Sequence, residues 1–142
     1  MVKKAFILIT LITIFLDQIS KYIIYIKQPT INLDILTINY VTNTGAGFGI
    51  LKGQTLILGI ISLAVAVGII YYYKELPKDR FAQAMYALFL GGVIGNGLDR
   101  FFRGFVIDFI DLGWWPAFNI ADSAISVAVV GLLYQNIFKK GP

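Results

Sequence analysis

Half of the acidic residues in this 142-residue chain lie in one polar stretch that apolar runs flank on both sides. The stretch covers residues 91–123 and contains Asp99, Asp108, Asp111 and Asp122. Carboxylates are costly to hold near hydrocarbon, so those that a membrane protein retains there are candidates for function. We predict that Asp108 and Asp122 form a catalytic pair.

A pair of facing carboxylates can hydrolyse an amide bond without histidine or metal. Two carboxyl groups held about 3 Å apart share one proton, because both cannot easily ionise at once. The ionised carboxylate takes a proton from water, while the protonated one donates to the carbonyl oxygen or to the leaving amine. The sequence does not distinguish the base from the acid, because a coupled pair titrates as a unit.

The composition excludes several kinds of site. The chain has no cysteine and no histidine, which rules out disulfides, zinc sites built on those residues and an imidazole base. We therefore expect no metal and no cofactor. The net charge of +4 arises mostly from Lys and Arg at the ends of apolar runs, which is typical of membrane topology signals and not of a nucleic-acid surface.

Hydropathy indicates that the chain is embedded in a membrane. Hydrophobic residues make up 58% of it and charged residues 14%, whereas a soluble domain has about 25% charged residues. Because helices satisfy their own backbone groups in lipid, we predict one all-α integral membrane domain over residues 1–142. Its four transmembrane helices should cover approximately residues 5–26, 55–73, 81–98 and 117–138.

The connector after the first helix has a different pattern. Within residues 27–54, apolar and polar residues alternate after Pro29, and the alternation shifts by one position at Leu36. Period-two alternation predicts short strands, and the shift predicts either a bulge or a break between two strands. Residues 43–49 then hold several glycines, which indicates a turn or a close backbone approach.

The distribution of basic residues predicts the topology. The N-terminus, the 74–80 connector and the C-terminus hold Lys3, Lys4, Lys74, Lys78, Arg80, Lys139 and Lys140. The 27–54 and 99–116 segments hold only Lys27, Lys52, Arg100 and Arg103. By the positive-inside rule both termini face the cytoplasm, and the two segments with the polar cluster face outward.

Helical spacing places further polar residues beside the acidic pair. Asp17 and Lys21 are four residues apart and can pair on one face of the first helix; this pair either orients the helix end or contacts substrate. Gly91 and Gly95 have a spacing that permits close helix contact. If the third helix continues, one face carries Asn96, Asp99, Arg100 and Arg103, and in the fourth helix Asn119 and Asp122 share a face with Ser123 and Ser126.

Three other interpretations compete with a carboxylate pair. The intramembrane Asp17 and Lys21 could belong to an ion path in a transporter or channel component. The four acids named above could bind calcium or magnesium through oxygen ligands. A serine–lysine dyad that uses Lys21 as its base ranks last, because no serine motif supports it.

Several motifs in order along the chain resemble the lipoprotein signal peptidase family, signal peptidase II. They are DQISK at residues 17–21, NTGAGF at 43–48, GNGLDR at 95–100, VIDF at 106–109 and FNIADS at 118–123. Gly47 and Gly97 depart from the residues expected there, and neither is an acid. The resemblance covers nearly the whole chain.

The resemblance implies an intramembrane aspartyl endopeptidase of the bacterial inner membrane. Its substrate would be a diacylglyceryl-modified prolipoprotein, cut on the amino side of the lipidated cysteine. Asp108 and Asp122 would be the catalytic dyad, and the active site would be lined or supported by Asn43, Asn96, Asp99, Arg100, Asn119 and Ala121. The family also implies a small β-cradle at the outer surface and inhibition by globomycin-type cyclic peptides, and we expect a monomer.

Overall fold

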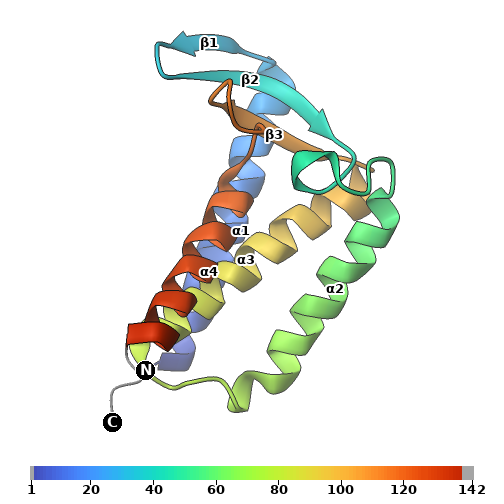
Figure 1. The fold of residues 1–142 in the computed structure, drawn as a ribbon. Coiled ribbons are helices and arrows are strands. Elements are labelled where there is room, and N and C mark those ends of the chain that lie inside the picture. The colour runs from blue at the N-terminus through green and yellow to red at the C-terminus, as the bar shows by residue number, and fades with distance from the viewer. Residues whose placement is uncertain (1, 139–142) are drawn as a thin grey trace.

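The computed structural model describes residues 2–138 and contains four long helices that carry a small sheet at one end (Figure 1). The helices are α1 (Val2–Lys27), α2 (Thr55–Tyr71), α3 (Arg80–Phe102) and α4 (Ile120–Phe138). All four are long and apolar enough to cross a membrane. The predicted fold class, four transmembrane helices with a small β-structure after the first, is confirmed.

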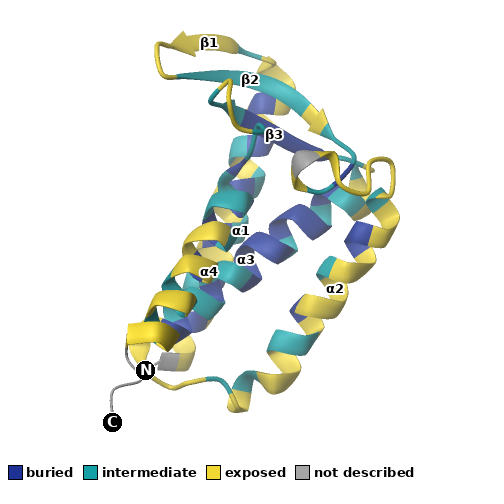
Figure 2. Cartoon of the chain, in the orientation of Figure 1, coloured by how far each residue is buried: buried dark blue, intermediate teal, exposed yellow. Residues whose placement is uncertain are grey.

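Helix α3 lies at the centre of the bundle and contacts each of the other three helices. Figure 2 shows it buried along much of its length. A Cβ atom on Gly91 would lie 2.6 Å from Cβ of Thr13, and one on Gly95 would lie 2.5 Å from Oδ2 of Asp17. Both contacts are too short for any larger residue, so these two glycines let α1 approach α3 closely, as their spacing predicted.

The outer helix faces are apolar and exposed. Phe15 of α1, Leu56 of α2 and Val130 of α4 each leave more than 60% of their surface uncovered. In water such faces would form a large apolar patch. In a membrane they contact lipid chains, in agreement with the length of the helices.

The sheet has three antiparallel strands in the order β1 (Thr30–Leu33), β2 (Leu36–Asn43) and β3 (Val106–Asp111). The shift at Leu36 is a break between two strands, because Asp34 and Ile35 form the hairpin turn between β1 and β2. Asp34 there has a φ of 51°, a left-handed conformation that Asp tolerates better than most residues. Strand β3 was not predicted, since almost every residue in its first half is buried and shows no alternation.

Several helix boundaries differ from the predicted ones. Helix α3 ends at Phe102 rather than at 98, and helix α4 begins at Ile120 rather than at 117. The later start follows from a contact with β3, because the backbone of Phe118 pairs with that of Ile110 through N–O distances of 2.9 and 3.0 Å. Short 3₁₀ helices, η1 (Gly47–Gly49) and η2 (Tyr72–Lys74), flank α2.

The two ends of the bundle carry different elements. Figure 1 shows the start of α1, the α2–α3 connector and the end of α4 together, opposite the sheet. We call this the connector end and the other the sheet end. At the connector end, Gln135 donates to Asp79 at 2.9 Å and joins α4 to the start of α3. Lys139 and Lys140, which contributed to the predicted topology, lie outside the described residues.

Candidate active site

Asp108 lies in the middle of β3, where it pairs with Val41 of β2 and is only 2% exposed. Two side-chain amides hold its carboxylate. Asn43 donates to Oδ2 at 2.9 Å, and Asn119 donates to Oδ1 at 2.8 Å. The strand therefore presents a carboxylate whose orientation is set from two sides, by the end of β2 and by the residue before α4.

Asp122 lies in the first turn of α4, whereas the sequence had indicated a position several residues inside the helix. The backbone N–H of Asp122 donates to Oδ1 of Asn119 at 2.9 Å, and the backbone N–H of Asn119 donates to Oδ2 of Asp122 at 3.2 Å. This reciprocal arrangement is a capping box. It leaves Oδ1 of Asp122 to accept from Asn96 of α3 at 2.7 Å.

Asn119 connects the two carboxylates and is fully buried. Its amide donates to Asp108, and its remaining groups cap Asp122, so one residue contacts both acids. The same amide lies 3.1 Å from Oδ1 of Asn96. The structure thus brings the predicted pair to one place, linked by two asparagines, and both asparagines were among the predicted site residues.

A buried ionic cluster lies directly behind this pair. Lys21 is fully buried, and its Nζ lies 2.8 Å from Oδ2 of Asp17 and 2.9 Å from Oδ2 of Asp99. It also donates to Oδ1 of Asn96 at 2.9 Å. The predicted pairing of Asp17 with Lys21 is therefore present, and Lys21 in addition bridges α1 to α3.

Asp99 and Asp17 are both neutralised within this cluster. Arg103 forms an ion pair with Oδ1 of Asp99 one helical turn away. The other oxygen of Asp17 accepts from the backbone N–H of Ala121 at 2.9 Å. Ala121 therefore acts through its backbone, and its fully buried side chain packs where α1, α3 and α4 meet.

Gln18 is a member of the cluster that sequence reasoning did not single out. Its amide nitrogen donates to Asp17, to the carbonyl of Gly95 and to Asp99 at 3.0–3.2 Å, and its oxygen accepts from Arg103 at 3.2 Å. Its position in the sequence could have identified it, because Gln18 precedes Lys21 by three residues and therefore lies on the same side of the helix. Arg100 lines a cavity beside Asp122 and donates to the carbonyl of Gly45 at 3.3 Å.

The surroundings of Asp108 favour a bound proton. Burial raises the pKa of its carboxyl from the ordinary 3.8 to about 6, and the negative charge of Asp122 adds to the rise. The hydrogen bonds from Asn43 and Asn119 stabilise the carboxylate and oppose this rise. Asp122, in the first turn of α4, accepts hydrogen bonds from the amide of Asn96 at 2.7 Å and from the backbone N–H of Asn119 at 3.2 Å.

Two adjoining cavities reach the pair from the sheet end. One of about 170 Å³ is lined by Asp122, Asn96 and Arg100, and one of about 370 Å³ is lined by Asp108. Asn43, Ala46, Pro116 and Ala117 border both. An extended peptide that passed from one cavity to the other would cross between the two carboxylates.

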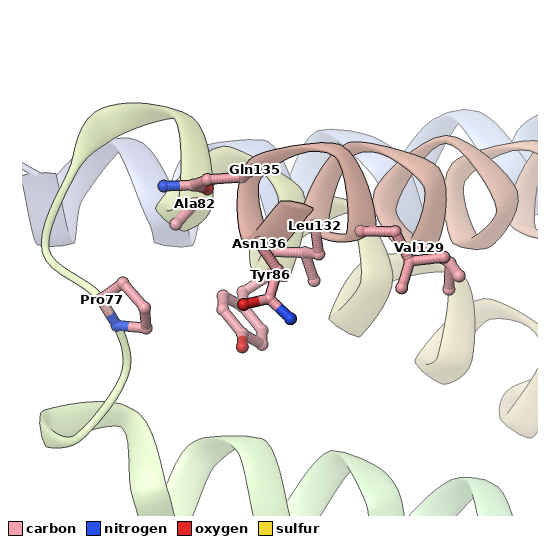
Figure 3. Close-up of a pocket in the computed structure, with 8 residues that line it drawn as sticks. Pro77, Ala82, Tyr86, Val129, Leu132, Gln135 and Asn136 are labelled. Carbon is pink, nitrogen blue, oxygen red and sulfur yellow. The ribbon is translucent and has the colours of Figure 1, made fainter. Parts of the chain in front are cut away.

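A third cavity, of about 610 Å³, lies at the connector end and carries no acid (Figure 3). Tyr86 of α3 and Leu132 and Asn136 of α4 line it, with Pro77 of the connector at its edge. Its residues offer neither a nucleophile nor an acid–base pair. Size alone therefore does not identify the active site.

The four acids of the polar stretch do not converge on one point. Asp111, at the end of β3, instead contacts Asn39 and the backbone of Gly113. Across residues 2–138, the structure contains no group of three or more acidic side chains spaced to hold a metal ion. A calcium or magnesium site made from this set of acids is therefore not supported by its geometry.

Comparisons with known proteins identify the family and support the fold. The sequence profile described as signal peptidase (SPase) II matches residues 9–138. The lipoprotein signal peptidase of Moorella thermoacetica is 39% identical to the chain, and the alignment covers 96% of this chain and 95% of that protein. The lipoprotein signal peptidase of Caldanaerobacter subterraneus is 40% identical, and the alignment covers 95% of this chain and 97% of that protein. Two solved structures, each described as a bacterial membrane enzyme, superpose with TM-scores of 0.88 and 0.85 at 30% identity, covering 97% of this chain and 92% and 95% of theirs.

Proposed function

The chain belongs to the signal peptidase II family, as its motifs predicted, and from this premise we propose that it removes the signal peptides of bacterial prolipoproteins. The bond cleaved lies on the amino side of a cysteine that already carries diacylglycerol. Asp108 and Asp122 activate the water that attacks this bond. The observation that carries the proposal is that Asn119 holds both carboxylates beside cavities that a peptide can enter.

The distribution of charge selects this pair from the other acids. Asp17 and Asp99 already contact Lys21 or Arg103 at ion-pair distance, so a proton transfer would break those pairs. Asp108 and Asp122 are held only by amide and backbone hydrogens among their hydrogen bonds. These donors orient a carboxylate without neutralising it, which leaves the pair free to exchange protons.

The charges of the whole cluster balance when the pair holds one proton. The acids are Asp17, Asp99, Asp108 and Asp122, and the bases are Lys21, Arg100 and Arg103. Four carboxylates against three cations leave one excess negative charge in a poorly hydrated place, and one bound proton cancels it. The cluster is therefore neutral in the state that general acid–base catalysis requires.

The surroundings of the two aspartates divide their roles. We assign the shared proton to Asp108, because burial and the neighbouring charge of Asp122 raise its pKa to about 6, closer to neutral pH than that of an ordinary carboxyl. We assign the base role to Asp122, which accepts hydrogen bonds from the amide of Asn96 and from the backbone N–H of Asn119. Asp122 is thus the general base and Asp108 the general acid in the first step.

The reaction then proceeds in two balanced steps. Water loses a proton to Asp122 and its oxygen bonds to the scissile carbonyl carbon, while Asp108 protonates the carbonyl oxygen. In the second step Asp122 returns its proton to the amide nitrogen and the C–N bond breaks. Asp108 recovers a proton from the gem-diol as the new carboxyl group forms, so the pair ends as it began.

The distribution of basic residues supports a position of this chemistry near the outer leaflet. The basic residues Lys3, Lys4, Lys74, Lys78 and Arg80 all belong to the connector end. By the positive-inside rule this end faces the cytoplasm, and the sheet end with its two aspartates faces outward. A lipid-modified substrate would then present its cleavage site near the outer membrane surface.

Cleavage of one diacylglyceryl prolipoprotein, followed by gel shift in detergent, tests the proposal. We expect the parent to cleave and both Asp108→Asn and Asp122→Asn to lose turnover. Asp111→Asn is a matched control, because it changes an acid of the same strand outside the pair. Substantial turnover by either dyad variant would remove the pair from the mechanism.

Flux measurements in proteoliposomes address the ion-path interpretation separately. The ion-path interpretation requires that the parent protein shows ion flux and no peptidase activity, and that this flux disappears in Lys21→Met. The buried cluster of Asp17, Lys21 and Asp99 lies near the sheet end, which favours the peptidase.

A further inference from the structure

A long apolar groove lies between α1 and α2, away from the candidate active site. It encloses about 570 Å³, within the range of about 300–1,000 Å³ typical of ligand sites. One wall is a stripe of α1 that includes Ile7, Leu11 and Ile14. The other wall comes from the end of α2, and Leu90 and Ile94 of α3 form the floor. Because α1 and α2 contact α3 and not each other, the groove stays open between them.

Two lysines lie at one end of this groove. Lys3 of α1 and Lys74 of η2 both line it. The rings of Phe6 and Tyr73 pack edge to face with centroids 4.8 Å apart, which joins the start of α1 to η2. Within residues 2–138 every ion pair belongs to the buried cluster near the sheet, so both ammonium groups are available to an anion.

The length of the groove matches one leaflet of a bilayer. From Lys3 to Ile14 helix α1 rises about 16 Å, at about 1.5 Å per residue. Half of a hydrocarbon core of about 30 Å is about 15 Å. The groove thus combines cations at headgroup level with an apolar surface that extends to the bilayer centre.

We propose that this groove binds one anionic phospholipid, with its phosphate on Lys3 and Lys74 and an acyl chain along the α1 stripe. Basic residues near a membrane surface attract anionic headgroups, and the exposed Ile7 and Leu11 gain a permanent apolar cover. The lipid fills the space between α1 and α2 and so supports α3, which carries Asn96 and Asp99. The proposal depends on membrane embedding and not on the aspartate pair.

The cavity of about 610 Å³ at the connector end differs from this groove in the charge of its lining. Among residues 2–138, its lining consists of apolar side chains, the phenol of Tyr86 and two amides, without lysine or arginine (Figure 3). It therefore offers nothing that would select a charged headgroup. Of these two cavities at the connector end, the groove between α1 and α2 is the one whose described lining joins an apolar wall to two lysines.

Native mass spectrometry of the full chain can measure bound lipid directly. The protein is purified in detergent with equal amounts of phosphatidylglycerol, which is anionic, and phosphatidylcholine, which is zwitterionic. We expect the parent to retain one phosphatidylglycerol. Lys3→Gln/Lys74→Gln should lower its preference for the anionic lipid about tenfold to 30-fold, because two charges leave the headgroup site.

Two further variants separate this site from general charge. Lys4→Gln/Arg80→Gln removes the same charge at the same end without touching the groove lining, and should change the preference less than about threefold. Leu11→Trp fills the groove and should reduce retention of phosphatidylglycerol. Equal losses in the two double variants, or full retention in Leu11→Trp, would overturn the proposal.

Discussion

Lys21→Met is the most direct test of the buried cluster. The change keeps a side chain of similar length and removes one ammonium group that touches three partners within 2.9 Å. Asp99 keeps Arg103 as a counter-ion. Asp17 keeps only neutral donors, Gln18 at 3.1 Å and the backbone of Ala121 at 2.9 Å, so its fully buried carboxylate loses its cation.

The expected loss follows from that uncompensated charge. Removing one partner of a buried ion pair lowers the free energy of unfolding by about 3–5 kcal/mol. Whole domains are stable by only about 5–15 kcal/mol. Asp17→Asn/Lys21→Met removes both charges and should therefore be more stable than Lys21→Met alone.

Unfolding in mixed micelles, followed by far-ultraviolet circular dichroism, measures these differences. Lys27→Met is the matched control, because Lys27 is exposed at the end of the same helix, and it should change stability by less than about 0.5 kcal/mol. The argument fails if Lys21→Met loses under about 1 kcal/mol, or if the double variant is less stable than the single one.

Three more predictions concern the pair and the helix contacts. The pKa of Asp108 is raised from 3.8 to about 6, so the stabilisation that the protonated carboxyl provides is full below about pH 4 and is lost as the pH rises through about 6. The unfolding midpoint should therefore fall more across this pH range in the parent than in Asp108→Asn. Equal falls in the two proteins would contradict this prediction. Asn119→Ala removes the residue that contacts both acids and should lower kcat in the cleavage assay about 100-fold through misplacement, with parental turnover as the refuting result. Gly95→Ala should lower the free energy of unfolding by about 1–3 kcal/mol through overpacking. Gly68→Ala, which has open space around the new Cβ atom, is the control and should be neutral or stabilising. Similar losses of stability in both variants would show that close packing is not the cause.

The sequence predicted the helices well because lipid imposes a simple rule on them. Long apolar runs identify all four, and period-two alternation identifies the hairpin of β1 and β2. Strand β3 escaped because Val106, Ile107 and Phe109 are buried on both sides, which removes the alternation. Without that strand, sequence alone supplied two carboxylates at compatible depth but no reason for them to meet.

The capping box at α4 shows a second limit. Pro116 suggested an early helix start, so Asp122 was assigned to the helix interior. The pairing of Phe118 with Ile110 delays the helix by several residues and places Asp122 in its first turn. That contact is long-range in character, because it depends on where β3 lies, and local propensity does not contain it.

The two ion pairs within single helices have a consequence for biosynthesis. Asp17 and Lys21 pair inside α1, and Asp99 and Arg103 pair inside α3, each across one turn. A lone charge at the centre of an inserting helix costs about 2.5–3.5 kcal/mol, and each pair lets its helix leave the translocon with these charges already balanced. Lys21 and Asp99 then meet only when the inserted helices assemble, so two of the cluster's four carboxylates enter the bilayer already paired with a cation.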